Sequence, residues 1–188
     1  TLLAADGSQI APDRHAEVLY GLVNVGIIQM RLPAPEAPQT RTASRLLYDR
    51  DILTRSGSML SDESLALQRD LAERQALVDL ARTAAPPVIS LTDGPLELWG
   101  AKDSADSTEF TDSLNKYLGF LTELSGLAVI TAGYVDKPAA GLVTRLLEVA
   151  LTPEADLPRI RESRPLQGVA DQDLYDSLLG PGERSAIF

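Results

Sequence analysis

The sequence predicts an α/β fold in which helices flank a mixed β-sheet. Short apolar runs rich in β-branched residues alternate with longer segments that have helical periodicity. The alternation lacks the regular strand–helix–strand rhythm of an all-parallel sheet, so we expect parallel and antiparallel strands together. The chain has 188 residues, of which 44% are hydrophobic, and this is enough to bury a sizeable core.

Four segments have the composition of strands. Residues 1–9 are expected to form a strand that ends in an Asp-Gly-Ser turn, and residues 16–30 one or two strands rich in β-branched side chains. The stretch 88–100, VISLTDGPLELWG, predicts a β-hairpin with Asp93 and Gly94 in its turn. The apolar run 127–134 predicts a buried strand.

Four further segments have helical periodicity. Ser61 is the expected N-cap of the longest helix, and the Pro86-Pro87 pair ends the segment that contains it. We expect helices over residues 61–84, 112–125, 138–151 and 171–179.

Residues 32–60 interrupt this pattern. The part from 32 to 44 is rich in proline, threonine and alanine, which is typical of a loop. We therefore expect a loop or insertion over 32–60 within a single domain that spans residues 1–188. The chain starts without Met inside an expected strand and stops as an apolar segment begins, so we expect a fragment that is incomplete at both ends.

The composition excludes several classes of protein. There is no cysteine, which excludes a disulfide framework and a Cys-based zinc site, and a single histidine excludes a repeated His-metal motif. No apolar run approaches the ~20 residues that span a bilayer, so we expect no membrane partner and a cytoplasmic protein. The formal net charge of -10 opposes nucleic-acid binding, unless the acidic residues surround metal ions or a basic partner delivers the substrate.

An Asp-Gly pair follows an apolar strand at two places in the sequence. Asp6-Gly7 follows residues 2–5, and Asp93-Gly94 follows residues 88–92. Each pair alone is typical of a turn. If the two strands are neighbours, the carboxylates lie close together, and a divalent cation relieves their repulsion. Oxygen-only ligands favour Mg²⁺ or Mn²⁺.

Glu73 is the candidate for a third carboxylate at this site. It lies in the middle of the longest expected helix, beside apolar residues. The segment from Glu73 to Asp93 is long enough for the helix to end, turn and return as a strand. Two metal ions roughly 4 Å apart, held by shared carboxylates, would bind the attacking water and the leaving oxygen in phosphodiester hydrolysis. The alternative interpretation of Glu73 is a solvated helix position.

Five segments, taken in order, resemble the NurA nuclease family. They are AADGSQIAPDRH with LYGLVNVGII after it, the helix with Glu73, SLTDGPLELWG, TAGYVDKPAAGLVTRLLEVAL and DQDLYDSLLGPGERSAIF. The resemblance covers nearly the whole chain. It implies a ribonuclease H-like fold in which Asp6 and Asp93 are strand-borne metal ligands and Glu73 is the helix-borne one, all three of them catalytic.

The same resemblance implies an activity and partners. Members of the family degrade DNA ends with Mn²⁺ (or Mg²⁺), typically as homodimers, and work with the hexameric HerA translocase in end resection during recombinational repair. His15, Tyr134 and Lys137 are further candidates for contact with nucleic acid. Family members continue past the Glu-Arg-Ser segment and bring a histidine to the active site, whereas this chain ends at Phe188.

Three other classes of protein share some of these sequence features. A catalytically silent scaffold of the same fold would bind a HerA-like hexamer without binding metal. An actin-like phosphotransferase also has Asp-Gly turns near phosphates, but the sequence has no Walker A motif. A protease is disfavoured, because the sequence lacks both the Asp-Thr/Ser-Gly turn and the G-x-S-x-G elbow.

Overall fold

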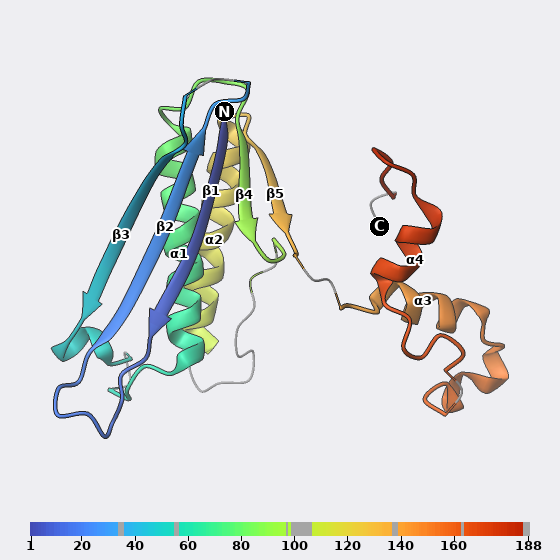
Figure 1. The fold of residues 1–188 in the computed structure, drawn as a ribbon. Coiled ribbons are helices and arrows are strands. Elements are labelled where there is room, and N and C mark those ends of the chain that lie inside the picture. The colour runs from blue at the N-terminus through green and yellow to red at the C-terminus, as the bar shows by residue number, and fades with distance from the viewer. Residues whose placement is uncertain are drawn as a thin grey trace. The chain divides into compact units, whose positions relative to one another are not determined.

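A computed structural model describes residues 1–33, 36–54, 57–96, 98, 107–136, 139–162 and 164–185. The chain forms two compact units, Thr1–Tyr134 and Val135–Phe188 (Figure 1). The expectation of a single domain over 1–188 stays a prediction.

The first unit is built on a five-stranded mixed sheet with the strand order β3-β2-β1-β4-β5 (Figure 1). In this sheet β2 runs antiparallel to both β1 and β3, whereas β4 runs parallel to both β1 and β5. The predicted mixed sheet is therefore confirmed. The strands are β1 (Leu2–Ile10), β2 (Gly21–Met30), β3 (Gln39–Leu47), β4 (Ile89–Asp93) and β5 (Ile130–Tyr134).

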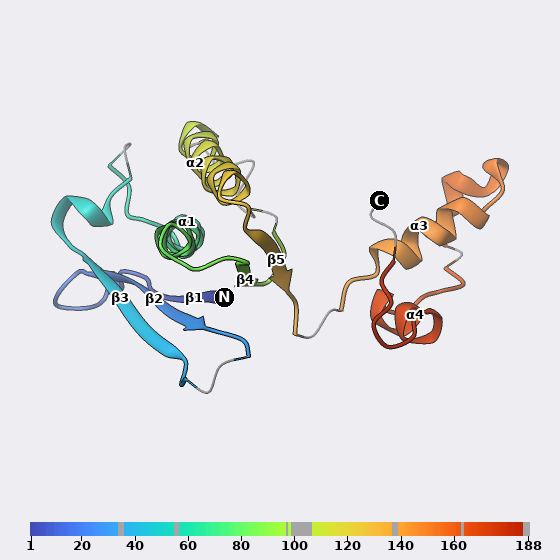
Figure 2. The same cartoon turned by 90° about the horizontal axis from the view of Figure 1, so that it is seen from above.

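Two long helices cover one face of this sheet. They are α1 (Asp62–Ala81) and α2 (Ser107–Gly126), and two perpendicular views place both on the same side (Figures 1 and 2). The predicted cap of α1 is confirmed, because the Ser61 hydroxyl accepts a hydrogen bond from the backbone N–H of Ser64 at 3.2 Å. Within the described part of this unit, the opposite face of the sheet carries no α-helix.

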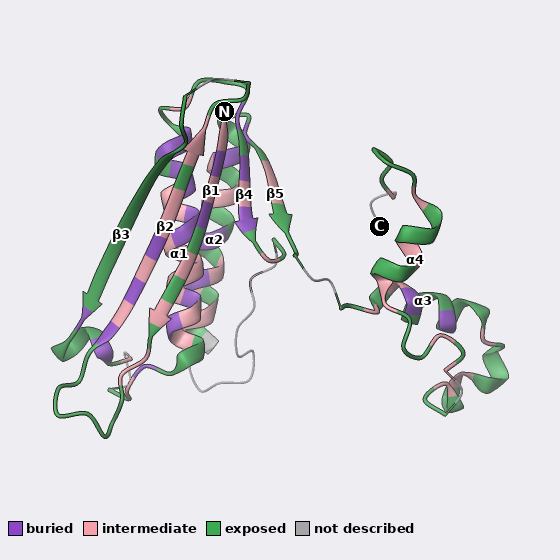
Figure 3. Cartoon of the chain, viewed as in Figure 1, coloured by how far each residue is buried: buried purple, intermediate pink, exposed green. Residues whose placement is uncertain are grey.

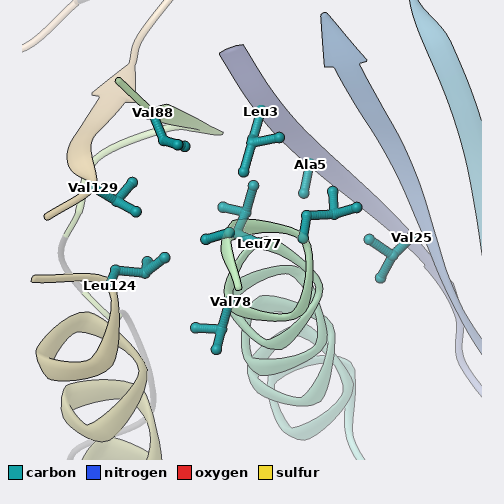
Figure 4. Packing of buried hydrophobic residues seen from close by; sticks show 10 residues of the cluster. Leu3, Ala5, Val25, Leu77, Val78, Val88, Leu124 and Val129 are labelled. Carbon is teal, nitrogen blue, oxygen red and sulfur yellow. The ribbon is translucent and has the colours of Figure 1, made fainter. Parts of the chain in front are cut away.

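The hydrophobic core lies between the sheet and the two helices. Leu3 of β1 and Leu77 and Val78 of α1 have no exposed surface, and each such side chain stabilises the fold by about 1.5–3 kcal/mol. Because side chains alternate along a strand, Ala4 and Asp6 point to the opposite face from Leu3. The rest of the cluster comes from β1, β2, both helices and the residues directly before β4 and β5 (Figure 4): Ala5, Val25, Leu80, Ala81, Leu124, Val88 and Val129.

The second unit contains α3 (Leu142–Leu151), a 3-10 helix η2 (Glu154–Arg159) and α4 (Asp171–Leu178). Polar side chains organise it. The Asp171 carboxylate accepts hydrogen bonds from the backbone N–H groups of Leu142 and Thr144 at 2.8 and 2.9 Å, and so caps α3 from the start of α4. Buried Glu148 of α3 accepts a hydrogen bond from the backbone N–H of Leu166 at 3.0 Å.

The four predicted helices are confirmed, with ends that differ by a few residues, but the loop expected over 32–60 is wrong in its middle. Strand β3 occupies 39–47, and a 3-10 helix, η1 (Asp49–Ile52), follows it. β3 is an edge strand whose side chains are exposed almost throughout (Figure 3). Because neither of its faces is buried, it lacks the apolar alternation that identifies a strand in sequence.

The predicted hairpin over 88–100 is also wrong. β4 pairs with β1 along one edge and with β5 along the other, so neither edge is free to accept a second hairpin arm. Residues 97, 99 and 100 lie outside the described residues. No helix in the described part of the chain is long and apolar enough to cross a membrane.

Candidate active site

Asp6 and Asp93 lie side by side on neighbouring strands. β1 and β4 pair in parallel as far as Ala5 and Thr92, so the two aspartates are the next residues in the same register. Adjacent strands are about 4.8 Å apart, and residues level with each other in parallel strands point to the same face. The expected pairing of two strand-borne carboxylates is therefore present.

Asp6 does not lie in a turn, which corrects the sequence interpretation. β1 continues through Asp6 and Gly7 to Ile10, because these residues pair antiparallel with Gly26 and Val25 of β2. β4, in contrast, stops at Asp93. Gly94 takes a φ of 79° and donates its N–H to the Tyr134 carbonyl at 2.7 Å. The site thus lies where a short strand ends beside a longer one.

Glu73 reaches this place from α1. Its side chain is buried, with 5% of its surface exposed. A Cβ atom added at Gly7 would lie 2.5 Å from Glu73 Oε1 and 2.5 Å from Arg69 Cγ, so any other residue here would have to displace these two side chains. The glycine after Asp6 is therefore explained by close approach and not by a turn.

Two cavities meet at the paired aspartates. One of about 660 Å³ opens over the uncovered face of the sheet, and its lining includes Asp6, Asp93 and Tyr134. The other, of about 340 Å³, lies toward the helices, and acidic residues from β1, β4 and α1 line it. Its charged and aromatic lining consists of Asp6, Asp70, Glu73, Asp93, Arg69, Arg74 and Tyr117.

The Glu73 carboxylate is held by two arginines. Arg69 Nε lies 3.4 Å from its Oε1, and Arg74 Nη1 lies 3.5 Å from its Oε2. Burial raises the pKa of Glu73 to about 7; the negative charges of Asp70 and Asp6 add to this, and the two arginines oppose it. Glu73 is therefore poised between its two protonation states near neutral pH.

A buried arginine and a buried tyrosine belong to the site and were missed from the sequence. Arg74 is 3% exposed, its Nε donates to Tyr117 Oη at 3.2 Å, and its guanidinium lies 5.2 Å from the centre of the tyrosine ring. One signal was available. Arg74 occupies the core-facing helical series of Leu67 and Val78, where a charged residue is unusual.

The other candidate residues differ in where they lie. Tyr134, which is 59% exposed at the end of β5, is level with Asp93 and lines the larger cavity. His15 is exposed in the connection between β1 and β2, where its backbone N–H donates to Asp13 Oδ1 at 2.9 Å, and it lines neither cavity. Lys137 lies outside the described residues.

The donor set fits an oxygen-preferring divalent cation by its chemistry. Four acidic residues line the smaller cavity, and carboxylate oxygens are the ligands that such a cation prefers. Among the residues that the structure describes, no three acidic or histidine side chains are arranged closely enough to bind one ion. To bind a cation, the Glu73 carboxylate would have to give up its ion pair with Arg69 or Arg74.

Comparison with known families identifies the chain. The family model of the NurA domain matches residues 1–188. The chain belongs to the NurA family. The family predicted from the sequence is thereby confirmed, as is its ribonuclease H-like mixed sheet. No curated protein matches this NurA domain.

Three solved structures are similar to this NurA domain. LC9-RNase H1, a type 1 RNase H with the type 2 active-site motif, is 10% identical with a TM-score of 0.41, over 74% of the domain and 65% of that chain. The NurA nuclease from Sulfolobus solfataricus is 12% identical with a TM-score of 0.38, and the match covers 68% of the domain and 41% of that chain. RuvC from Thermus thermophilus is 12% identical with a TM-score of 0.27, and the match covers 94% of the domain and 89% of that chain. The domain thus spans less than two thirds of the length of LC9-RNase H1 and of the Sulfolobus NurA nuclease.

Proposed function

We propose that this NurA-family nuclease domain is a metal-dependent deoxyribonuclease in which Asp6, Glu73 and Asp93 are the catalytic, metal-binding carboxylates. The observation that carries the proposal is the strand register that pairs Asp6 with Asp93 at the cavity lined by buried Glu73. It occurs in a chain that matches the NurA domain over its whole length.

The proposed chemistry is hydrolysis of a phosphodiester bond. Bound Mn²⁺ or Mg²⁺ would activate the attacking water and stabilise the charge on the leaving oxygen. Asp6 and Asp93 supply oxygen ligands from the strands. Glu73, once ionised and released from Arg69, would be the third residue to hold the ion. The guanidinium of Arg69 is one third exposed and donates to Asp70 Oδ1 at 2.9 Å, and its remaining N–H groups could then bind a phosphate oxygen of the substrate.

The substrate and partners follow from the family. We propose that the domain acts as an exonuclease on DNA ends during end resection in recombinational repair, in the cytoplasm, as a homodimer with a HerA-like hexameric ATPase. The net charge of -10 supports the need for a partner, because an acidic protein repels free DNA.

Contacts with the DNA are proposed for three residues. Tyr134 is the best supported, because an exposed aromatic ring beside Asp93 offers a surface on which a base can stack. Lys137 is proposed from its place in the sequence shortly after the strand 127–134, and His15 from its place near the first Asp-Gly motif.

The test is cleavage of end-labelled linear DNA by the full chain with Mn²⁺, with Mg²⁺ and with EDTA. We expect metal-dependent shortening that Asp93→Asn abolishes. Asp79→Asn is the matched control, because Asp79 lies on α1 but is exposed and pairs with Arg82. Full activity of Asp93→Asn would refute the assignment of this carboxylate.

A second candidate function is a catalytically silent scaffold that binds a HerA-like hexamer. The observation that favours it is the pairing of Glu73 with two arginines, in a described site where no three acidic side chains form a ligand set. Titration calorimetry with Mn²⁺ separates the two functions. Heat of binding that Asp6→Asn removes supports the nuclease, and a folded chain that binds the hexamer but no metal supports the scaffold.

A further inference from the structure

Arg74 and Tyr117 form a buried link between the helix that carries Glu73 and the turn that follows Asp93. Arg74 Nη1 lies 3.5 Å from Glu73 Oε2, and its Nε donates to Tyr117 Oη at 3.2 Å. Tyr117 Oη in turn donates to the carbonyl of Leu96 at 2.7 Å. One hydroxyl therefore joins α1, α2 and the segment after β4.

We propose that Arg74 and Tyr117 are positioning residues that fix the Glu73 carboxylate relative to Asp93. The inference rests on the proposed function, since it assigns these residues a purpose within the same site. Neither residue is expected to contact the DNA, because Arg74 is 3% exposed and Tyr117 is 2% exposed.

The geometry leaves Arg74 little freedom. Its guanidinium is planar and lies 5.2 Å from the centre of the Tyr117 ring, so rotation of either group breaks the stacking or the hydrogen bond. A buried arginine that lost the Tyr117 hydroxyl would leave its Nε–H without that hydrogen-bond acceptor. The position of the guanidinium is therefore set by Tyr117, and Glu73 is held against it.

The turn after Asp93 is held from two sides. On one side the Gly94 N–H donates to the Tyr134 carbonyl at 2.7 Å, and a Cβ atom added at Gly133 would lie 2.5 Å from Gly94 O. On the other side Tyr117 Oη binds the Leu96 carbonyl. Asp93 thus lies at the start of a short segment that is fixed to β5 and to α2.

Removing the Tyr117 hydroxyl should loosen both carboxylates at once. Groups that orient metal ligands typically change metal affinity or activity 10–100-fold when they are removed. Small displacements of reacting groups also lower the rate steeply without weakening substrate binding. A positioning role therefore predicts weaker Mn²⁺ binding and a lower kcat, with a KM for DNA that changes little.

The alternative is that the pair merely fastens α1 to α2. The chain offers a matched control for this, because Arg82 also joins the two helices. Its Nε donates to Glu123 Oε1 at 2.8 Å and its Nη1 to Asp79 Oδ1 at 2.8 Å. Arg82 lines neither cavity of the site. Arg82→Met therefore loosens the helix pair and leaves the carboxylates alone.

The experiment compares Tyr117→Phe and Arg74→Met with Arg82→Met and Tyr48→Phe in the full chain. Tyr48 is 58% exposed and lines neither cavity. The readouts are the Kd for Mn²⁺, kcat and KM on linear DNA, and hydrogen exchange of the Gly94 amide. For Tyr117→Phe we expect roughly 10–100-fold losses in Mn²⁺ affinity and kcat, a KM within about twofold, and faster exchange at Gly94. Both controls should match the wild type.

Unchanged Mn²⁺ affinity and kcat in a folded Tyr117→Phe variant would overturn the proposal, as would equal losses in Arg82→Met. Tyr117→Phe decides the matter if Arg74→Met fails to fold, because it removes a single oxygen. If the wild type neither binds Mn²⁺ nor cleaves DNA, the proposed function fails by itself. Exchange at Gly94 then decides the positioning role: acceleration confined to Tyr117→Phe supports it, and equal acceleration in Arg82→Met refutes it.

Discussion

Replacing Glu73 with glutamine should stabilise the metal-free protein at and above neutral pH. Glu73 is buried, and burial raises its pKa from the ordinary value of 4.5 to about 7, with Asp70 adding to the effect and Arg74 opposing it. Glutamine keeps the shape of the side chain but carries no charge. The substitution therefore removes the cost of burying the carboxylate.

The magnitude follows from the two pKa values. In the unfolded chain Glu73 loses its proton near pH 4.5, and in the folded chain near pH 7. Between these values the folded protein holds a proton that the unfolded chain lacks, so the free energy of unfolding falls by about 1.4 kcal/mol per pH unit. Over the whole interval the loss is at most about 3.5 kcal/mol. The Glu73→Gln variant does not lose this free energy, and in the wild type the loss stays constant above pH 7.

Urea denaturation followed by far-UV circular dichroism, from about pH 4 to about pH 9, measures this difference. The stability of Glu73→Gln relative to the wild type should grow from pH 4.5 to pH 7 and then level off. Asp79→Asn, an exposed carboxylate on the same helix, should show no such growth. A Glu73→Gln variant that is less stable than the wild type above pH 7 would refute the reasoning, because the ion pairs with Arg69 and Arg74 would then outweigh burial.

Three further predictions concern single groups. Gly7→Ala should destabilise the fold by about 1–3 kcal/mol in thermal denaturation, because its Cβ would overlap the side chains of Glu73 and Arg69. The control Gly119→Ala, in the open middle of α2, should stabilise the fold by up to about 1 kcal/mol, and equal effects of the two substitutions would contradict the close contact at Gly7. Asp171→Ala should remove the cap of α3 at a cost of about 1–2 kcal/mol and lower the helical circular dichroism signal, and an unchanged signal would count against the cap. Saturating Mn²⁺ should raise the Tm of the wild type but not of Asp93→Asn; an equal rise in both would place the ion elsewhere.

The pairing of Asp6 with Asp93 could be predicted from the sequence because it depends on local patterns. Two apolar strands are each followed by an aspartate. Because the helix with Glu73 lies between these strands in the sequence, it can connect them as parallel neighbours in the sheet. The cap at Ser61 is equally local.

Other features depend on contacts that no local pattern encodes. The hydrogen bond from Arg74 to Tyr117 joins residues 43 positions apart, and the sequence does not say which tyrosine lies under the arginine. Gly7 has the composition of a turn but serves a helix contact. β3 could not be predicted from the sequence, because an exposed edge strand has the polar composition of a loop.

The step between long β1 and short β4 makes the candidate site sensitive to chain length as well as to residue type. Side-chain direction alternates with each residue, so deleting one residue between Ile89 and Asp93 would turn the aspartate from the open face toward the packed face. The same deletion would place a charge beside apolar side chains. Deletions in the exposed connection between β1 and β2 carry no such penalty, because that segment sets no register. The length of β4 is therefore under tighter constraint than that of the connection around His15.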